Sequence, residues 1–150
     1  MLSGINFSPP LYFFFNFIAQ LIYPWSIEFL RLESVIWTIF GVILTFLVCR
    51  NAFGNSPAII SVLLVISQSS LLLQQSLEAR HYTMFFACGS WVLYETNRYK
   101  LHKQNLKGHI LLCSSNLSLC LVHYLGIIFS GFLVLAIFFV KTGIPITKRV

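Results

Sequence analysis

The sequence predicts an all-α fold, a polytopic transmembrane helix bundle of about five spans preceded by an amphipathic helix at the membrane interface. Of the 150 residues, 57% are hydrophobic and 9% are charged, whereas roughly a quarter of the residues of a soluble domain are charged. The mean hydropathy is +0.82, and the charged residues gather in short segments between long uncharged runs. We therefore predict an integral membrane protein in which residues 1–150 form a single transmembrane region.

An interfacial helix is predicted over about residues 9–25. The pair Pro9-Pro10 can open a helix, because proline is tolerated in a first helical turn. The apolar run that follows, residues 11–23, is interrupted by Asn16 and Gln20 and is short for a span, which needs ~20 residues. Its tyrosines and Trp25 are residue types that favour the headgroup layer, so we expect this helix to lie along the membrane surface.

Five spans are predicted at about residues 34–49, 57–73, 82–97, 108–123 and 125–140. A charged hinge, residues 28–33, precedes the first of them. Between residues 108 and 140 the only acidic or basic side chains are His109 and His123. One helix over that stretch would be about 50 Å long, well beyond a hydrocarbon core of about 30 Å. We therefore expect two shorter spans that turn near His123.

The distribution of Lys and Arg predicts the topology. Eight of the ten basic residues lie in the connection after the first span, the connection after the third and the tail, which leaves Arg31 and Arg80 on the other side. The side with the excess of Lys and Arg is cytoplasmic by the positive-inside rule. The segment that contains Arg80 and the turn at His123 are therefore expected to face outward. The net charge of +6 does not indicate nucleic-acid binding, because no basic stripe with exposed aromatic residues accompanies it.

The most polar stretch between two apolar runs is residues 74–82, which contains Glu78 and Arg80. An acid and a base beside a membrane are costly unless they are hydrated, paired or bound to a ligand, so this stretch is a candidate active-site loop. The alternative is that Glu78 and Arg80 mark the end of a span and reach for lipid headgroups. His123 has a corresponding alternative as an ordinary residue of the interface.

Several motifs occur in an order that resembles a known family. They are Pro9-Pro10-Leu11-Tyr12 with an aromatic helix, the segment 26–34, a span ending in Arg50-Asn51-Ala52-Phe53-Gly54, the run Glu78-Ala79-Arg80-His81-Tyr82, and His123-Tyr124. Over roughly residues 8–139 the chain looks like the N-terminal part of polytopic GT-C glycosyltransferases. The most similar group is the bacterial dolichyl-phosphate-mannose-protein-mannosyltransferase-like enzymes, which include the aminoarabinose transferases and the lipopolysaccharide core glycosyltransferases.

The resemblance implies transfer of a sugar from a polyprenyl-phosphate donor to a glycan, lipid or protein acceptor at the outer face of the bacterial cytoplasmic membrane. It assigns Glu78 as the catalytic residue, either as a base or as a group that orients the acceptor or a metal. Arg80 would pair with the donor phosphate, a role that suits its forked donors. The remaining residues assigned to substrate binding are His81, Tyr82, Pro9, Pro10, Tyr12 and His123. Membrane lipids are further expected partners.

The chain also departs from the family pattern. It contains no Asp and no acidic residue before Glu28, so the acid of the first outer loop has no counterpart; Phe7 stands two positions before the prolines, and Glu33 replaces the usual proline. A divalent metal is implied for the complete family fold, but no residues of this chain are assigned as metal ligands. We expect a fragment of a larger fold that is inactive alone. The alternative is a small non-catalytic membrane subunit or a degenerate relative.

Overall fold

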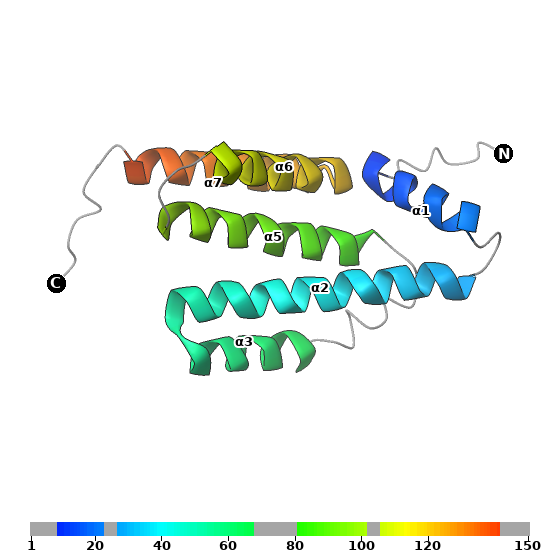
Figure 1. Ribbon diagram of the computed structural model, residues 1–150, viewed down its shortest axis with the longest axis horizontal. Helices are drawn as coiled ribbons and strands as arrows, with labels where there is room; N and C mark the ends of the chain where they lie inside the picture. Colours follow the sequence, from blue (N-terminus) through cyan, green and yellow to red (C-terminus); the bar gives the residue numbers. More distant parts are fainter. Residues whose placement is uncertain (1–8, 23–26, 68–80, 102–105, 142–150) are drawn as a thin grey trace.

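The structure, a computed structural model, describes residues 9–22, 27–67, 81–101 and 106–141. In this part of the chain it consists of α-helices without strands (Figure 1). The helices are α1 (Pro10–Ile22), α2 (Ile27–Phe53), α3 (Asn55–Ser67), α5 (Tyr82–Leu101), α6 (Leu106–Val122) and α7 (Leu125–Lys141). The all-α class is confirmed, and every predicted element overlaps one of these helices. Residues 23–25 of the predicted interfacial helix and residues 68–73 of the predicted second span lie outside the described residues.

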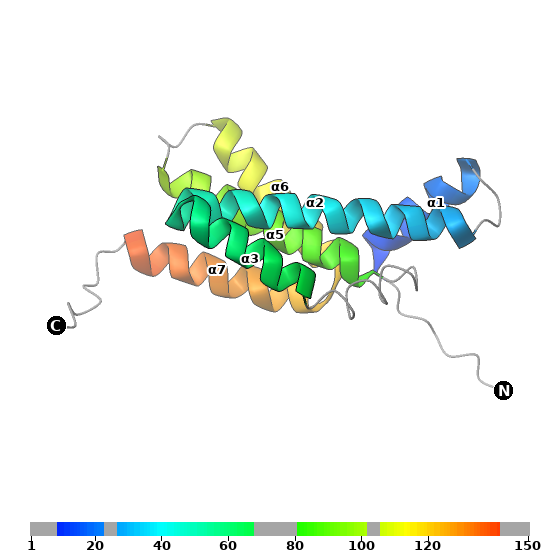
Figure 2. The same ribbon diagram turned by 90° about the horizontal axis from the view of Figure 1, so that it is seen from below.

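The helices pack as neighbours in the order α3, α2, α5, α6 and α7, with α1 against α6 and α2. Most of them follow the longest axis of the molecule, as Figures 1 and 2 show from two directions. Helix α1 lies at the end of the molecule where α2 and α5 begin. The bundle therefore has two distinct ends, and this end is composed of α1, the first turns of α2 and α5, and the connection from α6 to α7.

Helix α2 corrects the prediction of a charged hinge at residues 28–33. These residues form the N-terminal turns of a continuous helix of 27 residues. The segment contains no proline or glycine that would interrupt a helix before Gly41, and Glu28 in the first turn complements the positive end of the helix dipole. Charge alone does not break a helix. The result is a helix about 40 Å long whose charged end extends beyond its apolar part.

The connection between α2 and α3 is a single residue, Gly54. Its φ of 94° lies in the left-handed region that glycine adopts at little cost, and its N–H donates to the carbonyl of Arg50 over 3.0 Å. Helix α2 therefore extends to Phe53 rather than ending near residue 49, and α3 turns back along it (Figure 2).

Helices α2 and α5 run in the same direction and approach closely through small residues. A Cβ at Gly41 would overlap the ring of Phe86 and meet the backbone of Ala87. One turn further along, the hydroxyl groups of Thr45 and Ser90 are 3.1 Å apart and form a hydrogen bond. Small residues and interhelical hydrogen bonds are the means by which helices associate in a lipid environment.

The buried core is narrow and the outer surface is apolar. The core cluster consists of Met84, Cys88, Val92, Leu119 and Val122, from α5 and α6. Many large apolar side chains on α2, α3 and α7 are exposed. Within the described residues, one stretch is long and apolar enough to cross a membrane, residues 31–53 of α2, and only 17% of its most apolar window is buried inside the protein. An apolar helix face that the chain itself leaves uncovered is typical of a surface that contacts lipid or another protein.

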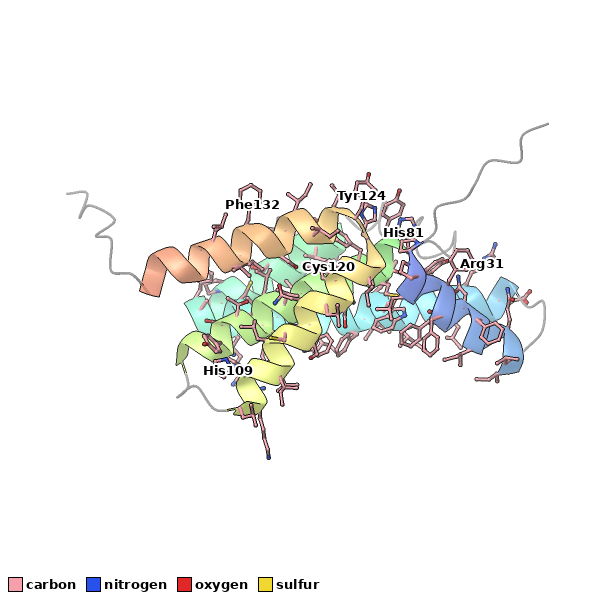
Figure 3. The ribbon with its side chains drawn as sticks, turned by 90° about the horizontal axis from the view of Figure 1, so that it is seen from above. Arg31, His81, His109, Cys120, Tyr124 and Phe132 are labelled. Carbon is pink, nitrogen blue, oxygen red and sulfur yellow. The ribbon has the colours of Figure 1, made fainter. Side chains whose placement is uncertain are left out.

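Charge separates the two ends of the bundle. Arg50 in the last turn of α2, Arg98 near the end of α5 and Lys107 at the start of α6 are found at one end, and Arg31 is found at the other (Figures 1 and 3). Arg98 lies 3.6 Å from Glu95 and over the ring of Tyr94. Among the basic residues named here, Arg31 is thus separated from the other three along the length of the bundle.

Candidate functional site

At the end of the bundle opposite Arg50, side chains from three separate parts of the chain form one group of rings. We call this group the ring cluster, and it consists of Tyr12, His81, Tyr82, Phe85, His123 and Tyr124. The centroids of the His81 and His123 rings are 5.2 Å apart, and that of Tyr12 is 5.9 Å from His81. Phe85 lies 5.0 Å and Tyr124 lies 4.3 Å from His123. Figure 3 shows His81 and Tyr124 at this end, next to α1.

Each ring is positioned by the end of a helix. The carbonyl of Pro9 accepts the N–H of Phe13 over 3.1 Å, and Pro10 is the first residue of α1, so the prolines fix the start of the helix that carries Tyr12. The carbonyl of His81 accepts the N–H of Phe85 over 2.9 Å. Helix α5 therefore begins directly at the ring cluster.

His123 lies in the connection from α6 to α7 and caps the N-terminus of α7. Its Nδ1 accepts the N–H of Leu125 over 3.1 Å, and its carbonyl accepts the N–H of Gly126 over 2.8 Å. A Cβ at Gly126 would collide with the carbonyl of Leu119, so the tight turn requires glycine there. The backbone thus holds the imidazole in place from one of its two nitrogens.

Burial determines the charge of His123. The residue is 6% exposed, and burial lowers the pKa of its imidazole below the usual value of 6.5. The ring is therefore neutral at neutral pH. Tyr124 beside it is 72% exposed and Tyr82 is 37% exposed, so the cluster has a buried histidine and an accessible tyrosine rim.

The residues described here do not fit a metal site. No group of three or more His, Cys, Asp or Glu side chains lies close enough together in the described ranges to hold a metal ion. Of the two histidines in the ring cluster, His123 already uses Nδ1 as an acceptor of a backbone N–H. Two imidazoles, one of them engaged in this way, are fewer ligands than a protein metal site requires.

An apolar groove runs beside the ring cluster. It has a volume of about 480 Å³, within the range of about 300–1,000 Å³ that is typical of small-molecule sites. The groove lies between α1, α2, α5 and α6, and its lining residues are Leu11, Phe15, Ile36, Trp37, Phe40, Met84, Cys88, Trp91 and Ser118. Leu11 and Met84 of the groove directly precede Tyr12 and Phe85 of the ring cluster in the sequence, so the groove ends close to the rings.

Glu33 is a residue that the sequence analysis placed in a charged hinge between helices. Its carboxylate instead accepts the indole N–H of Trp37 over 3.2 Å, and the side chain is half-buried. Trp37 in turn packs edge-to-face against Phe15 of α1, with centroids 5.4 Å apart. The sequence contained one usable signal, because Glu33 and Trp37 are four residues apart and such a pair shares a helix face.

The structure thus brings together four of the residues that the sequence selected for substrate binding: Tyr12, His81, Tyr82 and His123. Pro9 and Pro10 contribute through the backbone of α1. Glu78 and Arg80 lie outside the described residues, three positions and one position before His81 in the sequence. Phe85 was not selected, because a phenylalanine within an apolar run carries no chemical signal.

Comparison with known proteins adds no relative: no protein-family model, no curated protein and no solved structure matches this chain.

Proposed function

We propose that the chain is an integral membrane protein whose outward end binds a polyprenyl-phosphate-linked sugar, and that it forms part of the transfer site of a glycosyltransferase. The observation that carries the proposal is the convergence of Tyr12, His81, Tyr82 and His123. These residues come from separate motifs of the sequence, and their convergence at one end of the bundle is what a single site formed by those motifs would require. The proposal places the outward end of the bundle at this cluster.

The dimensions of the bundle support a membrane position with this end at the surface. Trp37 of α2 lies level with the start of α5, because Thr45 and Ser90 are paired further along the two helices. Residues 37–53 of α2, about 26 Å of helix, therefore lie beside the other helices. Helices α6 and α7 have 17 residues each, at the lower limit for a span. The remaining N-terminal turns of α2, with Glu28 and Arg31, would lie with α1 in the headgroup layer, where charged groups are hydrated.

The proposed ligand has an apolar tail and a phosphorylated sugar, and the site offers one surface for each. The groove beside α1 would take the first isoprene units of the tail, since its lining is apolar. The ring cluster would contact the phosphate and the sugar through hydrogen-bond donors and the faces of exposed rings. Glu78 and Arg80 precede the cluster directly in the sequence.

The transfer itself would follow from these groups. An acceptor hydroxyl attacks the anomeric carbon of the sugar, and the bond between this carbon and the phosphate oxygen breaks, so the polyprenyl phosphate leaves with the electron pair. Glu78 would take the proton of the hydroxyl, and Arg80 would neutralise the leaving phosphate.

The test is equilibrium binding of a labelled polyprenyl-phosphate sugar to the purified chain in detergent. We expect the donor to bind and to be displaced by unlabelled donor, whereas a sugar phosphate without the tail and a prenyl alcohol without the phosphate compete at least about tenfold less well, a difference of about 1.4 kcal/mol. Equal competition by the prenyl alcohol would mean that the groove takes any apolar chain, and the proposed function would be wrong.

A second candidate function is a non-catalytic membrane subunit. It is favoured by the exposed apolar face of α3, with Ile59, Ile60, Leu63 and Leu64 at 54–60% exposure, which in a complex would pack against a partner helix rather than lipid. The binding measurement above separates the two functions, because a subunit of this kind has no affinity for the donor.

A further inference from the structure

The hydrogen bond at Nδ1 of His123 fixes the tautomer of the ring. A neutral imidazole has one nitrogen that donates and one that accepts. Because Nδ1 accepts the N–H of Leu125 over 3.1 Å, it carries no proton, and Nε2 must carry it. The helix cap therefore determines which ring nitrogen is a donor, in the same way that a second hydrogen bond fixes functional histidines elsewhere.

The surroundings keep the ring in this state. Around His123 are the rings of His81, Tyr82, Phe85 and Tyr124, contributed by α5 and by the turn itself. The carbonyl of the same residue accepts the N–H of Gly126 over 2.8 Å. Rotation of the side chain would break the cap and these ring contacts, so the cap and the contacts together fix the direction of the Nε2–H bond.

We propose that His123 is a ligand-binding residue whose Nε2–H, held in place by the helix cap, donates a hydrogen bond to an oxygen of the bound phosphate. This inference deepens the proposed function and rests on it for the identity of the ligand. A donor that is neutral and fixed by the backbone differs from a general base or a metal ligand, because its nitrogen lone pair faces Leu125 and is already used. A hydrogen bond from such a donor to a charged oxygen is of the stronger kind.

Two substitutions test the cap at Nδ1 and the donor at Nε2 separately. In His123→Asn the side-chain oxygen lies near the position of Nδ1 and is a good helix cap, but the donor is lost. In His123→Gln the amide nitrogen reaches the position of Nε2, but the cap is lost. We expect His123→Asn to bind farnesyl phosphate about tenfold to a hundredfold more weakly than the wild type does. Both variants lose the packing of the ring, and we expect His123→Gln, which also loses the cap, to unfold at the lower temperature of the two while it retains more of the binding.

Nitrogen NMR of histidine-labelled protein tests the tautomer without any ligand. We expect a protonated Nε2 and an unprotonated Nδ1 for His123, with the His123→Asn spectrum providing the assignment. A protonated Nδ1, or a His123→Asn variant that binds farnesyl phosphate as well as the wild type does, would overturn the inference. If inorganic phosphate competed as well as farnesyl phosphate, the Nε2–H group would bind free phosphate rather than a lipid headgroup, and the inference as stated would be wrong. Failure of the wild type to bind any polyprenyl phosphate would instead reject the proposed function, whatever the tautomer.

Discussion

Gly41→Leu is expected to unfold the bundle or to lower its unfolding temperature strongly. A side chain at this position would enter the space of the Phe86 ring and press on the backbone of Ala87. Overpacking a close contact costs about 1–3 kcal/mol and more where backbone must shift, and here α2 and α5 would have to separate. Separation would also break the hydrogen bond between Thr45 and Ser90. Thermal unfolding followed by circular dichroism in detergent measures the effect.

The matched control is Gly131→Leu. Gly131 also lies within a helix, α7, but a Cβ there meets no atom within 4 Å. We expect the control to unfold at or above the temperature of the wild type, because leucine is a better helix former than glycine. Equal loss of stability in both variants would mean that α2 and α5 are not in close contact at Gly41.

Arg80→Ala is expected to lower the affinity for a polyprenyl-phosphate sugar about tenfold to a hundredfold. The reason is the loss of a charge-assisted hydrogen bond to phosphate, which contributes about 1.5–3 kcal/mol. Arg80→Lys should restore part of the affinity, since lysine keeps the charge but not the forked geometry. Binding of the labelled donor measures the change.

Arg50→Ala provides the control for net charge. Arg50 is exposed in the last turn of α2, at the opposite end of the bundle, so its removal changes the charge of the protein equally without touching the proposed site. Glu78→Gln should leave donor binding within about threefold, a difference well below 1.4 kcal/mol, while sugar transfer measured in a full-length form of the enzyme is lost. An Arg80→Ala variant that binds as the Arg50→Ala variant does would remove Arg80 from the site.

The helical class and the approximate positions of the helices could be predicted from the sequence, because long uncharged runs separated by charged segments are a strong signal. The helix ends could not. Residues 28–33 were interpreted as a hinge on account of their charge, yet a helix tolerates charge, and only Gly54 ended α2. Boundaries depend on single residues with unusual backbone angles, and these are harder to recognise than runs of apolar side chains.

The candidate site was predictable in part. Tyr12, His81, Tyr82 and His123 were selected from motifs, and the fold brings them together. The contribution of Phe85 and the pairing of Glu33 with Trp37 depend on how α1, α2 and α5 pack, and helix packing is a long-range property that a local pattern does not encode. The cap at Leu125 is another example, because it requires the exact course of the turn after α6.

The measurement that tests the central claim most directly is the placement of the two ends of the bundle on opposite sides of a membrane. In a chain whose native cysteines are replaced by alanine, Tyr124→Cys introduces a thiol at the ring cluster and Lys107→Cys introduces one at the basic end, both at exposed positions. We predict that an impermeant maleimide labels residue 124 in intact cells and labels residue 107 only after the membrane is opened. Labelling of both residues from the same side would contradict the account.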